Sequence, residues 1–160
     1  MLDARVPDEI EIRRATGADA DAVADLWLAS FDDALPTVRR AHGDDDVRGW
    51  IRGHLVARTD AWVGVRGGEV VAVLGLAPGW IEQLYVAPAH QGSGVGGRLV
   101  AFAQERADDE LQLWTFQVND RARAFYRLHG FREVELTDGG ANEEREPDVR
   151  LLWKRTGGEG

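Results

Sequence analysis

The chain has 160 residues and a formal net charge of −9 at pH 7, from 28 acidic and 19 basic side chains. This length suits a single domain that buries about two thirds of its unfolded surface. The negative charge argues against nucleic acid or an anionic membrane as a partner, because both require clustered cations. The sequence has no cysteine, which excludes disulfides and a thiol nucleophile, and we expect no metal site.

Residues 1–155 are predicted to form one domain, and residues 156–160, TGGEG, a disordered tail. The segment 1–11 carries acids and a proline where a secretory signal has a basic flank and an apolar core. No apolar run approaches about eighteen residues, the length that predicts a membrane-spanning helix. We therefore expect a cytoplasmic protein, a monomer or a homodimer, without nucleic-acid or membrane contacts.

The N-terminal third predicts a strand followed by two helices. The alternating stretch EIEIRRA from Glu9 is typical of a strand, and Thr16 or Asp19 then caps a helix. The apolar face of that helix is Ala22, Val23, Leu26 and Trp27. A second helix begins at residues 44–46 and carries Val47, Trp50, Ile51 and Leu55.

Three strands are predicted over residues 61–86, separated by the turn signals Gly67-Gly68 and Pro78-Gly79. A helix then starts in a glycine-rich loop and runs to Asp108. We expect further strands over residues 111–116, 131–136 and 149–153, a helix over 121–129 and a polar loop over 137–148. Hydrophobic periodicity alone therefore predicts a mixed α and β fold.

The glycine-rich loop is HQGSGVGGR, residues 90–98, with four glycines between Gly92 and Gly97. Glycine lacks a Cβ and tolerates positive φ, so backbone N–H groups can converge on a ligand. Because the loop opens a helix, free N–H groups and the helix dipole favour a phosphate there.

Two known phosphate-binding motifs fit this loop poorly. A P-loop needs Lys-Ser or Lys-Thr next, but Arg98 and Leu99 follow, and Lys154 is the single lysine of the chain. In a dinucleotide fingerprint the first glycine directly follows the strand, and an acid stands about twenty residues on. Here residues 87–91 intervene, and Gln117 occupies the position of the acid.

The sequence Gln91-x-x-Gly94-x-Gly96 resembles the Gln/Arg-x-x-Gly-x-Gly/Ala motif of the GNAT superfamily of acetyl-CoA-dependent N-acetyltransferases. The stretch IEQLYVAP, residues 81–88, is similar to that family's fourth strand, and NDRARAFYRLHGF, residues 119–131, to its following helix. The resemblance implies an α/β fold: a mixed, mostly antiparallel sheet with helices on both faces, in the order β-α-α-β-β-β-α-β-α-β-β.

The resemblance also implies an activity, the transfer of acetyl from acetyl-CoA to a primary amine by direct attack in a ternary complex. One branch of the family places a glutamate on the fifth strand shortly before the asparagine. Here the segment is LWTFQVN, with Phe116 and Gln117 where an acid would stand. A non-catalytic, regulatory domain that binds acyl-CoA is therefore the alternative.

By this resemblance the glycine-rich loop binds the pyrophosphate, the main chain of the fourth strand binds the pantetheine arm, and Asn119 meets the cosubstrate. The residues expected to bind acetyl-CoA are Leu84, Tyr85, Val86, Gln91, Gly92, Ser93, Gly94, Val95, Gly96, Gly97 and Asn119.

Tyr126, seven residues after Asn119, is expected to be the general acid, because a phenol holds its proton at neutral pH and can donate it to a departing thiolate. Glu82 is the expected general base. Strand alternation places it on the same face as Leu84 and enclosed by the sheet. His42 is the other candidate for the base.

The acceptor is expected to bind among the loop after the first helix, the fourth strand and the polar loop 137–148. The predicted acceptor-binding residues are Phe31, Leu35, His42, Trp80, Asn142, Glu143 and Glu144. A cationic amine would suit the acidic members of this set and the net charge of the chain.

Overall fold

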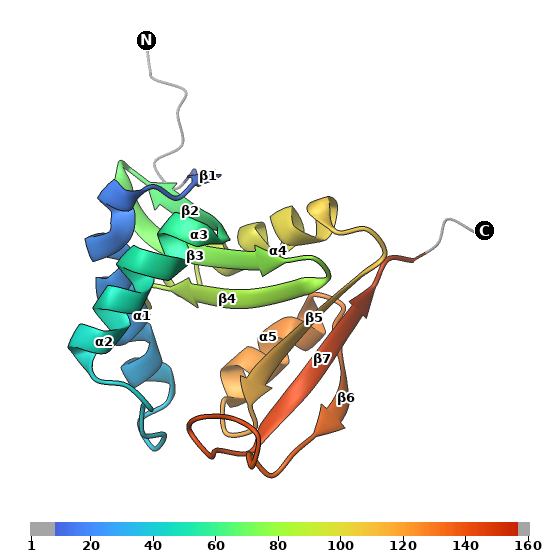
Figure 1. Ribbon diagram of the computed structural model, residues 1–160. Helices are drawn as coiled ribbons and strands as arrows, with labels where there is room; N and C mark the ends of the chain where they lie inside the picture. Colours follow the sequence, from blue (N-terminus) through green and yellow to red (C-terminus); the bar gives the residue numbers. More distant parts are fainter. Residues whose placement is uncertain (1–8, 157–160) are drawn as a thin grey trace.

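The computed structural model describes residues 9–156 and contains a seven-stranded sheet with helices on both faces (Figure 1). The strands lie in the order β1-β2-β3-β4-β5-β7-β6, where β4 and β5 are parallel and the other neighbours antiparallel. The mixed, mostly antiparallel sheet is confirmed. Of the tail predicted at residues 156–160, all but Thr156 lies outside the described residues.

The strands are β1 (Glu11–Arg14), β2 (Asp60–Arg66), β3 (Glu69–Ala77), β4 (Trp80–Val86), β5 (Glu110–Phe116), β6 (Arg132–Leu136) and β7 (Asp148–Lys154). The helices are α1 (Ala20–Ala34), α2 (Asp44–Trp50), α3 (Val56–Arg58), α4 (Val95–Arg106) and α5 (Asp120–Leu128). A π-helical turn at residues 51–55 joins α2 to α3, so the second predicted helix continues to Arg58. No helix within residues 9–156 is long and apolar enough to span a membrane.

Two glycine turns shape the β2–β3–β4 meander. Gly67 and Gly68 have φ values of +59° and +80°, the positive pair that a type I′ hairpin requires. Gly79 follows Pro78 with φ at +79°, a left-handed conformation that glycine adopts readily. Both turns lie where the dipeptides predicted them.

The β4–β5 junction divides the sheet into two halves. In the described chain these strands pair at one position, Trp80 opposite Gln112, where the Gln112 N–H donates to the Gly79 carbonyl oxygen at 2.9 Å. Beyond this vertex the two strands diverge (Figure 1). Over residues 82–86 the edge of β4 that faces β5 therefore has no strand partner within residues 9–156.

Two apolar cores hold the helices on the sheet. Helices α4 and α5 pack on one face, over residues of both halves such as Leu74 and Leu113. Helices α1 to α3 pack on the opposite face of the β1–β4 half, over Val63 and Val73. Because the first core includes strands on either side of the vertex, it joins the two halves.

An ion pair fixes the start of α1. The carboxylate of Asp19 accepts from the Arg13 guanidinium at 2.9 and 3.0 Å and from the Thr16 N–H at 2.8 Å. Asp19 is only 7% exposed, and the hydrogen bonds from Arg13 hold its carboxyl pKa below the usual value. This contact joins β1 to the first turn of α1.

Asp19→Asn should therefore lower the free energy of unfolding by about 1–3 kcal/mol, through loss of the charge-assisted hydrogen bonds from Arg13. A depressed carboxyl pKa stabilises the fold above the unfolded-state pKa of about 3.9, and that stability is lost as the pH falls further. Urea unfolding should show the difference from wild type shrinking below about pH 4, with the exposed Asp21→Asn as control. A difference independent of pH would contradict this assignment.

Candidate active site

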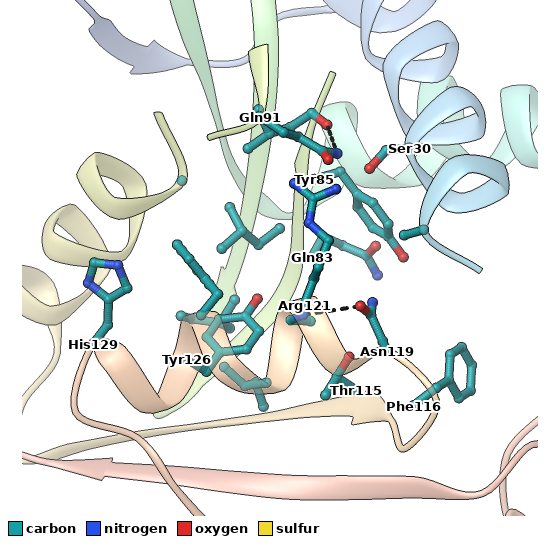
Figure 2. A pocket seen from close by; sticks show the side chains of 18 of the residues that line it. Ser30, Gln83, Tyr85, Gln91, Thr115, Phe116, Asn119, Arg121, Tyr126 and His129 are labelled. Atoms are coloured by element: carbon teal, nitrogen blue, oxygen red, sulfur yellow. Dashed lines mark hydrogen bonds between the residues drawn. The ribbon is translucent and has the colours of Figure 1, made fainter. Parts of the chain in front are cut away.

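A cavity of about 470 Å³ occupies the space where β4 and β5 diverge (Figure 2). Its walls come from α1, β4, the glycine-rich loop, β5 and α5. The predicted site residues that line it are Phe31, Leu35, Glu82, Leu84, Tyr85, Val86, Gln91, Gly92, Gly94, Gly96, Gly97, Asn119 and Tyr126. Residues from distant parts of the sequence thus surround one cavity.

The glycine-rich loop enters α4 at one end of the cavity. Gly92 and Gly94 have φ values of +76° and +93°, and Gly94 caps the helix that begins at Val95. The first N–H groups of a helix have no partner within it, and the helix dipole is positive at this end. The loop therefore has the backbone geometry that the sequence predicted for an anion site.

Side chains around the loop hold it in place. The Nε2 group of Gln91 donates to the Val86 carbonyl oxygen at 3.0 Å, which ties the loop to the end of β4. The Ser93 hydroxyl donates to the His90 carbonyl oxygen, and Val95 is buried in the core. Ser93 and Val95, which were predicted to bind acetyl-CoA, do not line the cavity.

Gly96 and Gly97 allow α4 and α5 to approach closely. A Cβ on Gly96 would lie 3.1 Å from Cζ of Phe125, and one on Gly97 would lie 3.1 Å from Cε1 of His129. Substitution of either glycine would therefore disturb the helix packing as well as the loop.

A bulge in β4 changes which side chains face the cavity. Ile81 and Gln83 pair with consecutive residues of β3, so Glu82 is the extra residue. Strict alternation predicted that Glu82 lies on the same face of β4 as Leu84, and this is wrong. Ile81, not Glu82, lies in the same apolar core as Leu84 and Val86. Glu82 lines the cavity as an exposed side chain and is not enclosed by the sheet.

Gln83 and Tyr85 lie on the other side of β4, toward α1. The indole N–H of Trp27 donates to Oε1 of Gln83 at 3.2 Å, and the Trp27 and Tyr85 ring centroids are 5.1 Å apart. Strand β4 therefore turns the aliphatic side chains of Leu84 and Val86 toward α4 and α5, and the polar and aromatic side chains of Gln83 and Tyr85 toward α1.

The ends of α5 position Asn119 and Tyr126. Oδ1 of Asn119 accepts from the Ala122 N–H at 3.1 Å as the helix cap, which leaves its Nδ2 group available. At the other end Gly130 has φ at +94°, and the Phe131 N–H donates to the Tyr126 carbonyl oxygen at 3.0 Å. These are features of a Schellman motif, and the Phe131 ring packs edge-on against Tyr126. The Gly130-Phe131 sequence thus fixes the position of Tyr126.

The hydroxyl of Tyr126 points into the cavity, and the residue is 7% exposed (Figure 2). Among residues 9–156 this hydroxyl has no hydrogen-bond partner. Burial raises the pKa of the Tyr126 phenol, with a further contribution from Tyr85. Burial also raises the pKa of Tyr85, and the charge of Glu144 adds to this effect. Both phenols are therefore protonated donors at neutral pH.

Sequence analysis missed five polar residues that line the cavity, Ser30, Gln83, Thr115, Arg121 and His129. Figure 2 shows Arg121 reaching from the start of α5 across the cavity toward Gln91. Arg121 has no ion-pair partner in the described part of the chain. A guanidinium that faces a glycine-rich loop suits a phosphate. The Asn119-x-Arg121 spacing was visible in the sequence, but it does not reveal the direction of the side chain.

Several predicted acceptor residues lie outside the cavity lining. Trp80 stands at the sheet vertex. The amide of Asn142 bonds the Glu146 carbonyl oxygen and the Asp148 carboxylate, so it holds the β6–β7 loop internally. These two residues have structural roles in the free protein.

The remaining acceptor residues bring two loops together. Nε2 of His42 lies 3.3 Å from both carboxylate oxygens of Glu143, which joins the loop after α1 to the β6–β7 loop. Glu144 follows in the same loop and acts electrostatically on Tyr85. At this end the rings of Phe31 and Phe116 meet edge to face, with centroids 6.5 Å apart.

The acetyltransferase (GNAT) family model matches residues 20–131, and the chain belongs to this family. An uncharacterized N-acetyltransferase of Archaeoglobus fulgidus is 29% identical over 154 residues, which is 84% of this chain and all of the relative. This membership supports an acyl-CoA-dependent acetyltransferase.

Solved structures share the same fold. The apo form of YjaB from Escherichia coli gives a TM-score of 0.77 at 22% identity, over 91% of this chain and 97% of that one. The PaiA N-acetyltransferase of Thermoplasma acidophilum, solved with coenzyme A, gives a TM-score of 0.70 at 18% identity, over 92% of this chain and 99% of that one. The GNAT fold that the sequence implied is therefore confirmed.

The two tyrosines of the chain, Tyr85 and Tyr126, both line the cavity. An exposed phenol ionises near pH 10, whereas we expect no tyrosinate absorbance from the folded protein at about that pH. A raised phenol pKa stabilises the fold at lower pH, and this stability is lost as the pH rises, so ionisation should accompany alkaline unfolding. Tyrosinate absorbance and circular dichroism over one pH series test this. Ionisation near pH 10 with the fold intact would contradict it.

Proposed function

We propose that the protein transfers the acetyl group of acetyl-CoA to a primary amine by direct attack within this cavity. The observation that carries the proposal is the Tyr126 hydroxyl, which points into the same cavity as the glycine-rich loop and has no hydrogen-bond partner among residues 9–156. Membership of the family supports the acyl-CoA cosubstrate. A domain that only bound acyl-CoA would gain nothing from a positioned proton donor.

In this proposal the glycine-rich loop and Arg121 hold the phosphates of the cosubstrate. The edge of β4 that has no strand partner, from Leu84 to Val86, binds the pantetheine arm through main-chain groups. Asn119 donates a hydrogen bond to the cosubstrate through its free Nδ2 group. Acetyl-CoA supplies an activated acyl group, and the chain supplies its orientation.

Glu82 is the proposed base, since it is an acid that lines the cavity and is open to solvent. It takes one proton from the ammonium form of the acceptor. The free amine then forms its C–N bond to the acetyl carbon as the C–S bond breaks. Tyr126 gives its proton to the departing sulfur and regains one from the acylated nitrogen. The net reaction yields the amide, the free thiol and one proton.

Removal of the phenolic oxygen separates catalysis from binding. Tyr126→Phe keeps the ring and its packing on Phe131, so the Kd for acetyl-CoA should stay within a few-fold of wild type. For the best amine in a broad panel, kcat should fall about 10²- to 10⁴-fold, the usual contribution of a positioned acid. Thiol release and calorimetry measure the two quantities. Equal activity would remove Tyr126 from the mechanism.

The same experiment tests the non-catalytic alternative. Tight binding of acetyl-CoA by the wild type, with no transfer to any amine in the panel, would support an acyl-CoA-binding domain and overturn the proposed enzyme.

Arg121 provides a separate test of the phosphate site. Arg121→Met should raise the Kd for CoA about 5- to 50-fold, the effect of losing one charge-assisted contact, with the larger loss at low salt. Arg127→Met is the matched control, because Arg127 lies on the same helix but pairs with Glu133 outside the cavity. Equal affinity of wild type and Arg121→Met would place the phosphates elsewhere.

A further inference from the structure

The α1 side of the cavity carries three polar groups for which the proposed catalysis has no role. They are the Ser30 hydroxyl, the Gln83 amide and the Tyr85 phenol, all labelled in Figure 2. Ser30 is 5% exposed, and its hydroxyl has no hydrogen-bond partner among residues 9–156. Because Ser30 lines the cavity, its hydroxyl is available to a ligand and can both donate and accept a hydrogen bond.

The orientation of the Gln83 amide is fixed by its neighbour. The indole N–H of Trp27 can only donate, so the amide atom that it contacts at 3.2 Å must be the oxygen. The Nε2 group then lies on the free side of the amide. Both of its N–H donors lack a protein partner within the described residues.

Gly75 makes room for this arrangement. It pairs with Gln83 across the β3–β4 ladder, and a Cβ on Gly75 would lie 3.2 Å from Cβ and 3.3 Å from Cγ of Gln83. The bulge at Glu82, the missing side chain at Gly75 and the bond from Trp27 together place the amide in the cavity wall.

The three groups lie on neighbouring positions of α1 and β4. Ser30 is one helical turn after Trp27, whose ring packs against Tyr85 and whose N–H holds Gln83. Gln83 and Tyr85 offer neutral N–H and O–H donors, and the Ser30 hydroxyl can donate as well. A set of three neighbouring hydrogen-bond donors binds an oxygen that accepts hydrogen bonds. Arg121 also reaches into the cavity, but the proposed function assigns its charge to the phosphates of the cosubstrate. The carboxylates of Glu82 and Glu144 would then repel an anionic oxygen, whereas a neutral carbonyl would not be repelled.

We infer that the acceptor is an α-amino amide, whose neutral carbonyl oxygen, next to the reacting amine, accepts from Nε2 of Gln83. The inference rests on the proposed function. Phe31 and Phe116 border the same end of the cavity and would hold an apolar side chain on that acceptor. A free amino-acid amide and the first residue of a peptide share this chemistry.

The test compares three amines that share one aryl group: phenylalaninamide, free phenylalanine and phenethylamine. For the wild type, kcat/KM for the amide should exceed that for phenethylamine by about 10-fold or more, the effect of one hydrogen bond to a buried donor. Gln83→Leu should abolish this preference, chiefly through a higher KM for the amide. Its Kd for CoA and its rate with phenethylamine should stay within a few-fold of wild type.

Two further variants separate positioning from packing. Trp27→Phe keeps a ring but releases the amide, so it should reduce the preference partly. Gln104→Leu, on α4 and outside the cavity, is the matched glutamine control and should preserve the preference for the amide.

A tripeptide amide that begins with phenylalanine distinguishes the two possible acceptors. Faster transfer to it than to phenylalaninamide indicates a peptide acceptor, and slower transfer indicates a small molecule.

Equal losses for the amide and phenethylamine in Gln83→Leu would overturn the inference, and so would a wild-type preference for free phenylalanine. If no amine is acetylated, the proposed function fails separately, and calorimetry of phenylalaninamide with the CoA-bound protein decides the inference. Binding that is lost in Gln83→Leu would support it, and no binding to the wild type would overturn it.

Discussion

The single point of contact between β4 and β5 is the constraint on which the site depends. A strand edge inside a domain normally pairs with its neighbour, because unpaired main-chain groups are costly. Here the ladder stops after Trp80 and Gln112, and the diverging strands leave a cavity whose wall is an unpaired edge. The core under α4 and α5 includes strands of both halves and keeps them together, so this edge persists within an otherwise ordinary sheet.

Both helices on the α4–α5 side present their ends to the cavity, for different local reasons. α4 begins there because Gly92 and Gly94 adopt left-handed conformations that turn the chain into the helix. α5 is capped at its start by Asn119 and stopped by Gly130, which sets the position of Tyr126 between them. Donors from two helices and one strand thus converge without a metal ligand set among the described residues.

Local signals in the sequence predicted the features that depend on neighbouring residues. The Gly67-Gly68 hairpin, the loop at Gly92–Gly97 and the helix that ends at Gly130 each follow from the φ values that glycine permits, and the structure has all three. The family motif then supplied the order of strands, which periodicity could not. The family motif also supplied the role expected of Tyr126, for which periodicity alone favoured packing beside Phe125.

What the sequence did not predict depends on contacts between distant segments. The bulge at Glu82 breaks the two-residue period, and nothing in the letters of β4 marks it. The bond from Trp27 to Gln83 spans 56 positions and that from His42 to Glu143 spans 101, so neither appears in any local pattern. Arg121 was missed for the same reason, since only the fold shows that its side chain crosses the cavity.

The vertex also has a mechanical consequence. Rotation of one half of the sheet about Trp80 and Gln112 would widen or narrow the cavity without breaking a ladder inside either half. At the far end, the contact between the buried Phe31 ring and Phe116 and the exposed His42–Glu143 pair bridge the gap, and an exposed ion pair contributes little to stability. Small changes in these two contacts would therefore set how far this end of the cavity opens.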